Sequence, residues 1–205
     1  FTLFAAPPEK ELEWNINGLM GAYRFINRIY LVISDTFNFA DKEANKNNKY
    51  NIDLEKRSEK DEEIQKKLHQ TIKKVTESIE DYFHFNTAIA GIMELLNDMT
   101  TYKQEVIEKN DISSQSKKIW KEVIEKVILL ISPFAPHIAD ELWEVIGNST
   151  FTFEEEWPTF EEELTKEHKM NLVVQINGKI RETIPSTIGL SKEEYEKLAF
   201  ASEKI

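Results

Sequence analysis

The sequence predicts a mainly α-helical protein, in which a bundle of four to five helices precedes a small α+β piece made of one hairpin and one helix. Between residues 15 and 147, apolar side chains recur at spacings of three and four, which is typical of helices buried on one face. Polar loops separate these stretches. After residue 170, two β-branched runs flank Asn177-Gly178, a pair typical of tight hairpins.

The composition is that of a globular protein, because 40% of the 205 residues are hydrophobic and 31% are charged. The chain has no cysteine, which excludes disulfides and thiolate metal sites. Its net charge of -11 argues against broad phosphate binding but permits a local basic face. It shows no apolar run of about 20 residues and no secretory leader. We therefore expect a cytoplasmic protein that does not enter a membrane. We also expect a monomer, although composition does not determine the oligomeric state.

The first half of the bundle is predicted from two apolar stripes. Residues 1–14 contain Pro7-Pro8, which cannot lie inside a helix, and we expect them to be an entry segment cut from a longer chain. The first helix begins at about Asn15, and its stripe comprises Tyr23, Ile26, Tyr30, Ile33 and Phe37. Residues 41–60 are polar and predicted to be a loop, and Asp61 is a suitable cap for the next helix. Its stripe comprises Ile64, Leu68, Ile72, Val75, Ile79 and Tyr82.

The second half of the bundle contains a break marked by prolines. The third stripe comprises Ile89, Ile92, Leu96 and Met99, and the fourth comprises Trp120, Ile124, Val127 and Ile131. Ser113 or Ser114 is the expected cap between them. In SPFAPHIADELW, residues 132–143, Pro133 and Pro136 end one helix and begin another. We expect Phe134 to be buried at this break and His137 to be structural.

Beyond the bundle, residues 148–169 are strongly acidic and predicted to form a solvated linker. Residues 170–205 form the truncated α+β domain. Its hairpin permits two registers, one with a two-residue turn that pairs Ile176 with Lys179. The other has a bulged turn that places Val174 opposite Ile180, and we favour it for its better apolar face. Ser191 with Glu194 forms a capping box that opens the final helix.

The residues do not form any catalytic motif that we recognise. The sequence lacks G-x-S-x-G, a close pair of histidines, and the glycine-rich loops that hold phosphates. We therefore expect no catalytic residues, metal site or cofactor site in this chain. The sequence predicts a protein that binds, positions or supports something.

Three stretches in order resemble a known family. SPFAPHIADELW resembles the signature of the helical anticodon-binding domain of class I aminoacyl-tRNA synthetases for leucine, isoleucine and valine. FAAPPEKELEW with GLMGAYRFINRIY is similar to the segment after the K-M-S-K-S loop in leucyl-tRNA synthetases of bacterial type. VVQINGKIRETI is similar to the start of their small C-terminal domain. The resemblance covers essentially the whole chain.

The resemblance implies a parent enzyme that activates leucine with ATP and Mg²⁺ and transfers it to tRNA(Leu). The synthetic and editing sites lie outside these residues, so the fragment itself should lack both activities. Residues 15–147 would be an anticodon-binding-type bundle that packs along the tRNA. Residues 170–205 would be a C-terminal domain that touches the tRNA's outer corner. The partners implied are tRNA(Leu) and the rest of the synthetase chain.

Within this resemblance, the first helix offers the clearest candidate site. At about 100° per residue, Arg24 and Arg28 fall opposite the predicted apolar stripe, with Asn27 at the flank. The family's Arg-Phe-Leu-Asn-Arg motif matches as RFINR, and arginine suits bidentate phosphate contacts. We expect these three residues to contact the tRNA backbone. Lys179 and Arg181, which follow the hairpin turn, are candidates for a second contact.

Two alternatives remain. The same region of a valyl- or isoleucyl-tRNA synthetase would share the bundle, although FAAPPEKELEW and the Asn-Gly hairpin favour leucine. A helical scaffold that binds protein is an interpretation from another class. It predicts a large exposed apolar patch and no clustering of Arg24 and Arg28.

Overall fold

The computed structural model describes residues 1–41, 57–81, 83–109, 112–166, 169–176, 178–187 and 191–201. They belong to two compact units, Phe1–Thr165 and Lys166–Ile205, and each unit is described by itself. The structure is mainly helical with one small sheet, as the sequence predicts. Among the helices described, none has the length and apolarity needed to cross a membrane.

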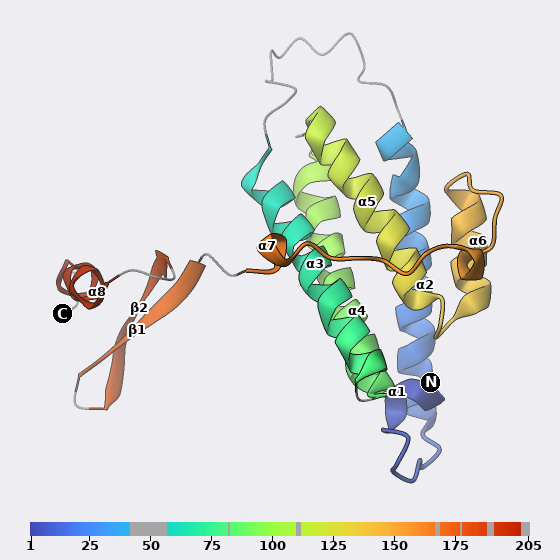
Figure 1. The fold of residues 1–205 in the computed structure, drawn as a ribbon, viewed down its shortest axis with the longest axis horizontal. Coiled ribbons are helices and arrows are strands. Elements are labelled where there is room, and N and C mark those ends of the chain that lie inside the picture. The colour runs from blue at the N-terminus through green and yellow to red at the C-terminus, as the bar shows by residue number, and fades with distance from the viewer. Residues whose placement is uncertain are drawn as a thin grey trace. The chain divides into compact units, whose positions relative to one another are not determined.

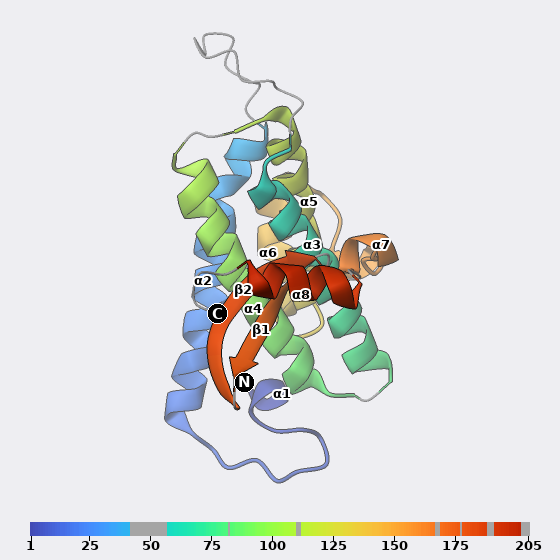
Figure 2. The same ribbon diagram turned by 90° about the vertical axis from the view of Figure 1, so that its left-hand side faces the viewer.

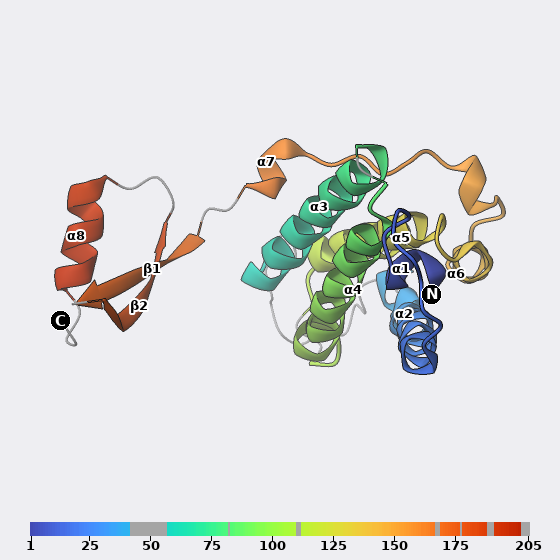
Figure 3. The same ribbon diagram turned by 90° about the horizontal axis from the view of Figure 1, so that it is seen from below.

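The first unit is a helical bundle whose long helices lie side by side (Figures 1 and 3). The helices that build it are α1 (Thr2–Ala5), α2 (Ile16–Asp41), α3 (Glu59–Glu80), α4 (Phe85–Tyr102), α5 (Ser114–Ile131) and α6 (Pro136–Val145). A π-helical turn, η1 (Lys103–Ile107), continues α4. A 3₁₀ turn, η2 (Thr152–Glu154), and the short α7 (Glu162–Thr165) follow α6.

The caps of α3 and α5 explain where these helices begin. Ser58, rather than the predicted Asp61, is the N-cap of α3, and its Oγ accepts from the Asp61 amide at 3.1 Å. Asp61 instead completes the capping box, since its carboxylate accepts from the Ser58 amide at 2.8 Å. The predicted cap Ser113 forms the equivalent box with Ser116 at the start of α5.

The core confirms three of the four predicted stripes. Most of the largest buried side chains come from α3, α4 and α5, among them Leu68, Ile72, Ile92, Leu96, Trp120 and Ile131, and α2 adds Ile29 and Ile33. Ile79 is only partly buried at the end of its stripe, and Tyr82 lies outside the described residues. The stripe predicted for α2 differs from the observed one.

A buried polar network joins the helices across this core. Asp61 is fully buried and accepts from the Tyr102 hydroxyl at 2.5 Å and from the Ser116 hydroxyl at 3.0 Å. The Tyr102 ring stacks on Trp120 with 5.0 Å between centroids, and the Trp120 indole donates to Thr36 at 3.1 Å. Because every member has a partner, the network fixes how α2, α3, α4 and α5 pack together.

The break marked by the two prolines lies where the sequence predicts it. Helix α5 ends at Ile131, and α6 begins with Pro136 in its first turn. Phe134 packs edge-on against Phe85, with 6.4 Å between ring centroids. Phe134 packs against the core but is only partly buried, so the expectation that it is buried was wrong.

Residues 148–165, which we call the strap, do not form the solvated linker that was predicted. They belong to the first unit and run across the bundle (Figure 1). The Glu161 amide donates to the buried His69 Nδ1 at 3.0 Å, and the Trp157 indole donates to Thr76 at 2.9 Å. Lys73 on α3 pairs with Glu162 at 2.8 Å. The acidic side chains therefore flank a strap that is bonded to α3.

The second unit contains β1 (Lys169–Ile176), β2 (Lys179–Thr187) and α8 (Lys192–Phe200). The strands are antiparallel, and Ile176 pairs with Lys179 across a two-residue turn in which Gly178 has a φ of 75°. The favoured bulged turn was therefore wrong. A bulge does occur, but at Arg181, because Gln175 pairs with Ile180 and Val174 pairs with Glu182.

Candidate nucleic-acid interface

The buried face of α2 is turned by about a quarter of a helical turn from the predicted stripe. Ala22, Ile29, Val32, Ile33 and Thr36 face the core. Tyr23, which the prediction placed near the centre of the buried stripe, is 61% exposed. Apolar residues occur almost all around this helix, so their spacing fits more than one face. The contacts with α4, α5 and α6 decide between the faces.

This rotation gives the two arginines of α2 different surroundings. Arg28 lies beside α4, the helix that runs along α2 in Figure 2. Its guanidinium donates to Asn97 at 2.7 Å, to Thr100 at 2.8 Å and to the Leu96 carbonyl at 3.3 Å. Arg28 is thus a tether between α2 and α4. Both arginines are exposed, as the sequence predicts, but Arg28 is also hydrogen-bonded to α4.

Arg24 is exposed, and within the described residues it makes no hydrogen bond or ion pair. The neighbouring Asn27 uses its amide Nδ2 to donate to the Tyr23 carbonyl at 2.8 Å, so the side chain lies against its own helix. Of the three predicted residues on α2, Arg24 therefore has the guanidinium available for a phosphate.

The charge around Arg24 is positive although the chain is acidic. Residues 16–34 contain two arginines and no aspartate or glutamate. The first acid beyond them, Asp35, pairs with Lys103 at 2.8 Å. An anion that approaches this part of α2 therefore meets no uncompensated carboxylate from the helix itself.

The exposed side of α2 also carries apolar side chains. One of them was predicted to be buried, and the others were not predicted to have a role. We call this side the outer face of α2, and it comprises Ile16, Met20, Tyr23, Arg24, Asn27 and Leu31. Ile16 and Tyr23 are more than 60% exposed. The sequence could have indicated this exposed apolar surface, because apolar residues occur all around the helix and a helix in a bundle needs only one apolar stripe.

The cations of the hairpin are exposed on the second unit. Lys179 follows the turn directly, and Arg181 is the extra residue of the bulge. Val173 and Ile180 are also exposed, whereas Leu172, Val174 and Ile184 are half-buried. The bulge thus gives the hairpin one sheltered apolar face and places Arg181 where strand pairing does not constrain it.

Comparison with known proteins assigns the family. A family model described as "Anticodon-binding domain of tRNA ligase" matches residues 61–197. The chain belongs to this family. The match covers α3 to α8 and omits α2, so Arg24 and Arg28 lie outside it.

Individual relatives of this anticodon-binding domain extend the similarity over α2. A leucine–tRNA ligase of Thermosipho melanesiensis is 41% identical over the whole chain, and one of Fusobacterium nucleatum is 45% identical over 88% of it. A LeuRS of Agrobacterium radiobacter, solved in a ternary complex with tRNA and LeuAMS, is 27% identical with a TM-score of 0.75. That likeness covers 98% of this chain and 24% of the LeuRS chain.

The similarity concerns a limited part of the relatives. The chain spans 24% of the Thermosipho protein and 20% of the Fusobacterium protein. The resemblance to leucyl-tRNA synthetases is confirmed for this part. Their remaining three quarters or more have no counterpart among these 205 residues.

Proposed function

We propose that this domain is the tRNA-binding portion of a leucine–tRNA ligase and holds tRNA(Leu) while other domains attach leucine to it. The names of the relatives and the LeuRS solved with tRNA support the proposal. ATP and Mg²⁺ would be used by those other domains, and we assign them no residue here. We place the protein in the cytoplasm, as a monomer whose partners are tRNA(Leu) and the rest of its own chain.

The outer face of α2 is the observation that carries this proposal. Arg24 offers an unpaired guanidinium within residues 16–34 of α2, a stretch without aspartate or glutamate, in a protein whose net charge is -11. Guanidinium groups bind phosphate oxygens through two parallel hydrogen bonds. Tyr23 and Met20 beside it can pack against ribose. This face would contact the tRNA backbone without reading its sequence.

Arg28 would act through position rather than through direct contact. Its three hydrogen bonds to α4 hold α2 at a fixed rotation, and that rotation points Arg24 outward. The contact of Arg28 itself with tRNA stays a prediction, as does that of Asn27. Lys179 and Arg181 would form a second, separate phosphate contact on the hairpin.

Neither alternative is favoured. The valyl- and isoleucyl-tRNA synthetase alternative gains nothing from the relatives, which are named leucine–tRNA ligases. A protein-binding scaffold would explain the exposed Ile16 and Leu31. It would not explain why Arg24 stands among them with acids absent from residues 16–34.

Binding of residues 1–205 to tRNA(Leu) tests the proposal. The association constant is measured by fluorescence anisotropy between about 25 and 200 mM salt. Because phosphate contacts release counterions, we expect its logarithm to fall linearly with the logarithm of salt concentration. An unstructured RNA of the same length and composition serves as the control. Equal binding of the two RNAs, or none at the lowest salt, would refute the proposal.

A further inference from the structure

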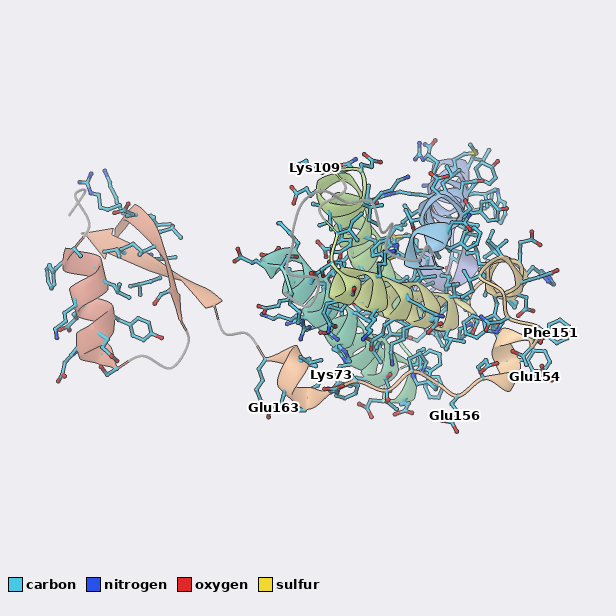
Figure 4. All side chains as sticks on the ribbon, turned by 90° about the horizontal axis from the view of Figure 1, so that it is seen from above. Lys73, Lys109, Phe151, Glu154, Glu156 and Glu163 are labelled. Atoms are coloured by element: carbon cyan, nitrogen blue, oxygen red, sulfur yellow. The ribbon has the colours of Figure 1, made fainter. Side chains whose placement is uncertain are left out.

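The first part of the strap, which follows α6, exposes a pair of stacked aromatic rings. Phe151 is 55% exposed and Phe153 is 77% exposed. Their ring centroids are 5.5 Å apart, and their planes differ by 12°. Figure 4 shows Phe151 pointing away from the ribbon of the first unit. A pair of exposed phenylalanines is a local apolar surface that the bundle does not need for its own core.

The backbone beneath these rings is fixed to α6. Thr152, the residue between them, is buried, and both its amide and its hydroxyl donate to Asp140, at 2.9 Å and 2.7 Å. These hydrogen bonds hold the pKa of the Asp140 carboxyl below its usual range. The Trp143 indole donates to Thr150 at 3.1 Å. The rings are therefore presented by a preorganised loop, so binding there costs little ordering of the backbone.

Negative charge surrounds the pair. Glu154, Glu155 and Glu156 follow it directly, and all three are exposed. In Figure 4, Glu154 lies near Phe151, and Glu156 projects from the next part of the strap. Glu141 and Glu144 are exposed on α6, the helix that anchors the loop. A phosphate backbone would be repelled here, so the surface does not suit RNA.

We propose that Phe151 and Phe153, with Glu154 and Glu156, form a docking site for a protein segment rich in arginine. A guanidinium stacks on an aromatic face and at the same time donates to a carboxylate beside it. The Glu154 carboxylate lies close to the rings, because it accepts from the Phe151 amide at 2.9 Å, and the exposed rings add apolar area for the arginine stem. This site is separate from the outer face of α2 and does not depend on tRNA binding.

The test uses residues 1–205 with ¹³C-labelled phenylalanine and a pentaarginine peptide as the probe. We expect the ring signals of Phe151 and Phe153 to shift on titration, with weak affinity. The F151S/F153S double variant should raise the dissociation constant about tenfold, as should E154Q/E156Q. A pentalysine peptide should bind more weakly than pentaarginine, because lysine lacks the planar stacking group.

Two control variants distinguish peptide binding at this site from non-specific attraction of a cationic peptide to an acidic protein. Phe200 is 78% exposed on α8, and Glu9 and Glu11 are exposed in the entry segment. F200S and E9Q/E11Q should leave the affinity for pentaarginine unchanged. The proposal is overturned if the controls weaken binding as much as the loop variants, or if the peptide does not bind. It is also overturned if F151S/F153S weakens binding of tRNA(Leu), since the surface would then serve RNA.

Discussion

At the scale of single residues, Arg24 and Arg28 show how one motif supplies two roles. They are four positions apart, yet about 40° of rotation separates them on the helix. That angle suffices to bring Arg28 within 2.7 Å of Asn97, while Arg24 remains in solvent. A motif match alone cannot make this distinction, because the partners Asn97 and Thr100 lie about 70 positions away in the sequence.

The first prediction concerns the stability supplied by this tether. Arg28→Ala removes three hydrogen bonds to α4, so we expect the free energy of unfolding to fall by about 1 kcal/mol. Arg24→Ala, the matched control, should change it by less than about 0.5 kcal/mol. Urea unfolding of both variants measures the difference. Equal stabilities of the two variants would show that Arg28 does not tether the helices.

The buried Asp61 network gives a second prediction at this scale. Tyr102→Phe keeps the ring stacked on Trp120 but removes the donor to the Asp61 carboxylate. A buried carboxylate that loses a donor destabilises the fold, so we expect a loss of about 1–3 kcal/mol in the free energy of unfolding. Urea unfolding again provides the measurement. An unchanged midpoint would mean that Asp61 does not need this hydroxyl.

At the scale of elements, the strap depends on one neutral histidine. His69 is 2% exposed, and its Nδ1 accepts from the Glu161 amide, so the proton of the neutral ring lies on Nε2. Burial lowers the pKa of His69; Glu122 and Glu161 oppose this shift, and Lys126 adds to it. Protonation of Nδ1 would replace the acceptor with a donor and break the bond to the strap.

This arrangement predicts the direction of a pH effect. The unfolded chain protonates His69 near its ordinary pKa of 6.5, whereas the folded protein resists protonation because its pKa is lower. Stability should therefore decline as pH falls below about 6.5 and should level off below the folded pKa. Thermal unfolding between about pH 7.5 and 5 measures the slope.

The control for this pH effect is His69→Gln, which lacks a titrating ring. Relative to it, the wild type should lose stability as pH falls. If both proteins show the same slope between about pH 7.5 and 5, other groups would account for the pH dependence. Because the chain has four tryptophans, the difference in fluorescence between the wild type and Trp157→Phe reports the strap, whose indole is hydrogen-bonded to Thr76 on α3.

Among the elements, local patterns predicted some features well and others poorly. Helices α3, α4 and α5 are polar on the side opposite the apolar stripe. Their periodicity therefore identified buried residues such as Leu68 and Trp120. The two prolines placed the break between α5 and α6 because their chemistry acts locally. The strap was not predicted, because its many acidic residues favoured a solvated linker. Its hydrogen bonds go to His69 and Thr76, which lie more than 80 positions away in the sequence.

At the scale of the whole molecule, the chain consists of two units. One is the helical bundle together with the strap, and the other is the hairpin unit. The first unit extends to Thr165, so part of the predicted linker belongs to it. We expect residues 1–165 to unfold at the same temperature as the bundle transition of residues 1–205. Calorimetry of both proteins measures this. A shift of about 5 °C or more would show that the hairpin unit contributes to bundle stability.

The candidate site was only partly predictable at this scale. The motif RFINR predicted a phosphate contact on α2, because a pair of arginines on one helix can bind phosphate oxygens. The rotation of α2, the hydrogen bonds of Arg28 and the exposed Ile16 follow from packing against α4, α5 and α6. Those contacts depend on the whole core, and a helix that is apolar on several sides does not specify its own orientation.

The central claim is that the outer face of α2 contacts the tRNA backbone through Arg24, and the salt dependence of Arg24→Glu tests it most directly. We compare tRNA(Leu) binding of this variant with that of Lys109→Glu, which makes the same charge change at an exposed lysine after η1 (Figure 4). Removing one phosphate contact should reduce the slope of log association constant against log salt by roughly 0.7–0.9. We expect that reduction, with weaker binding, for Arg24→Glu and not for Lys109→Glu. Identical slopes and affinities for the two variants would contradict the claim.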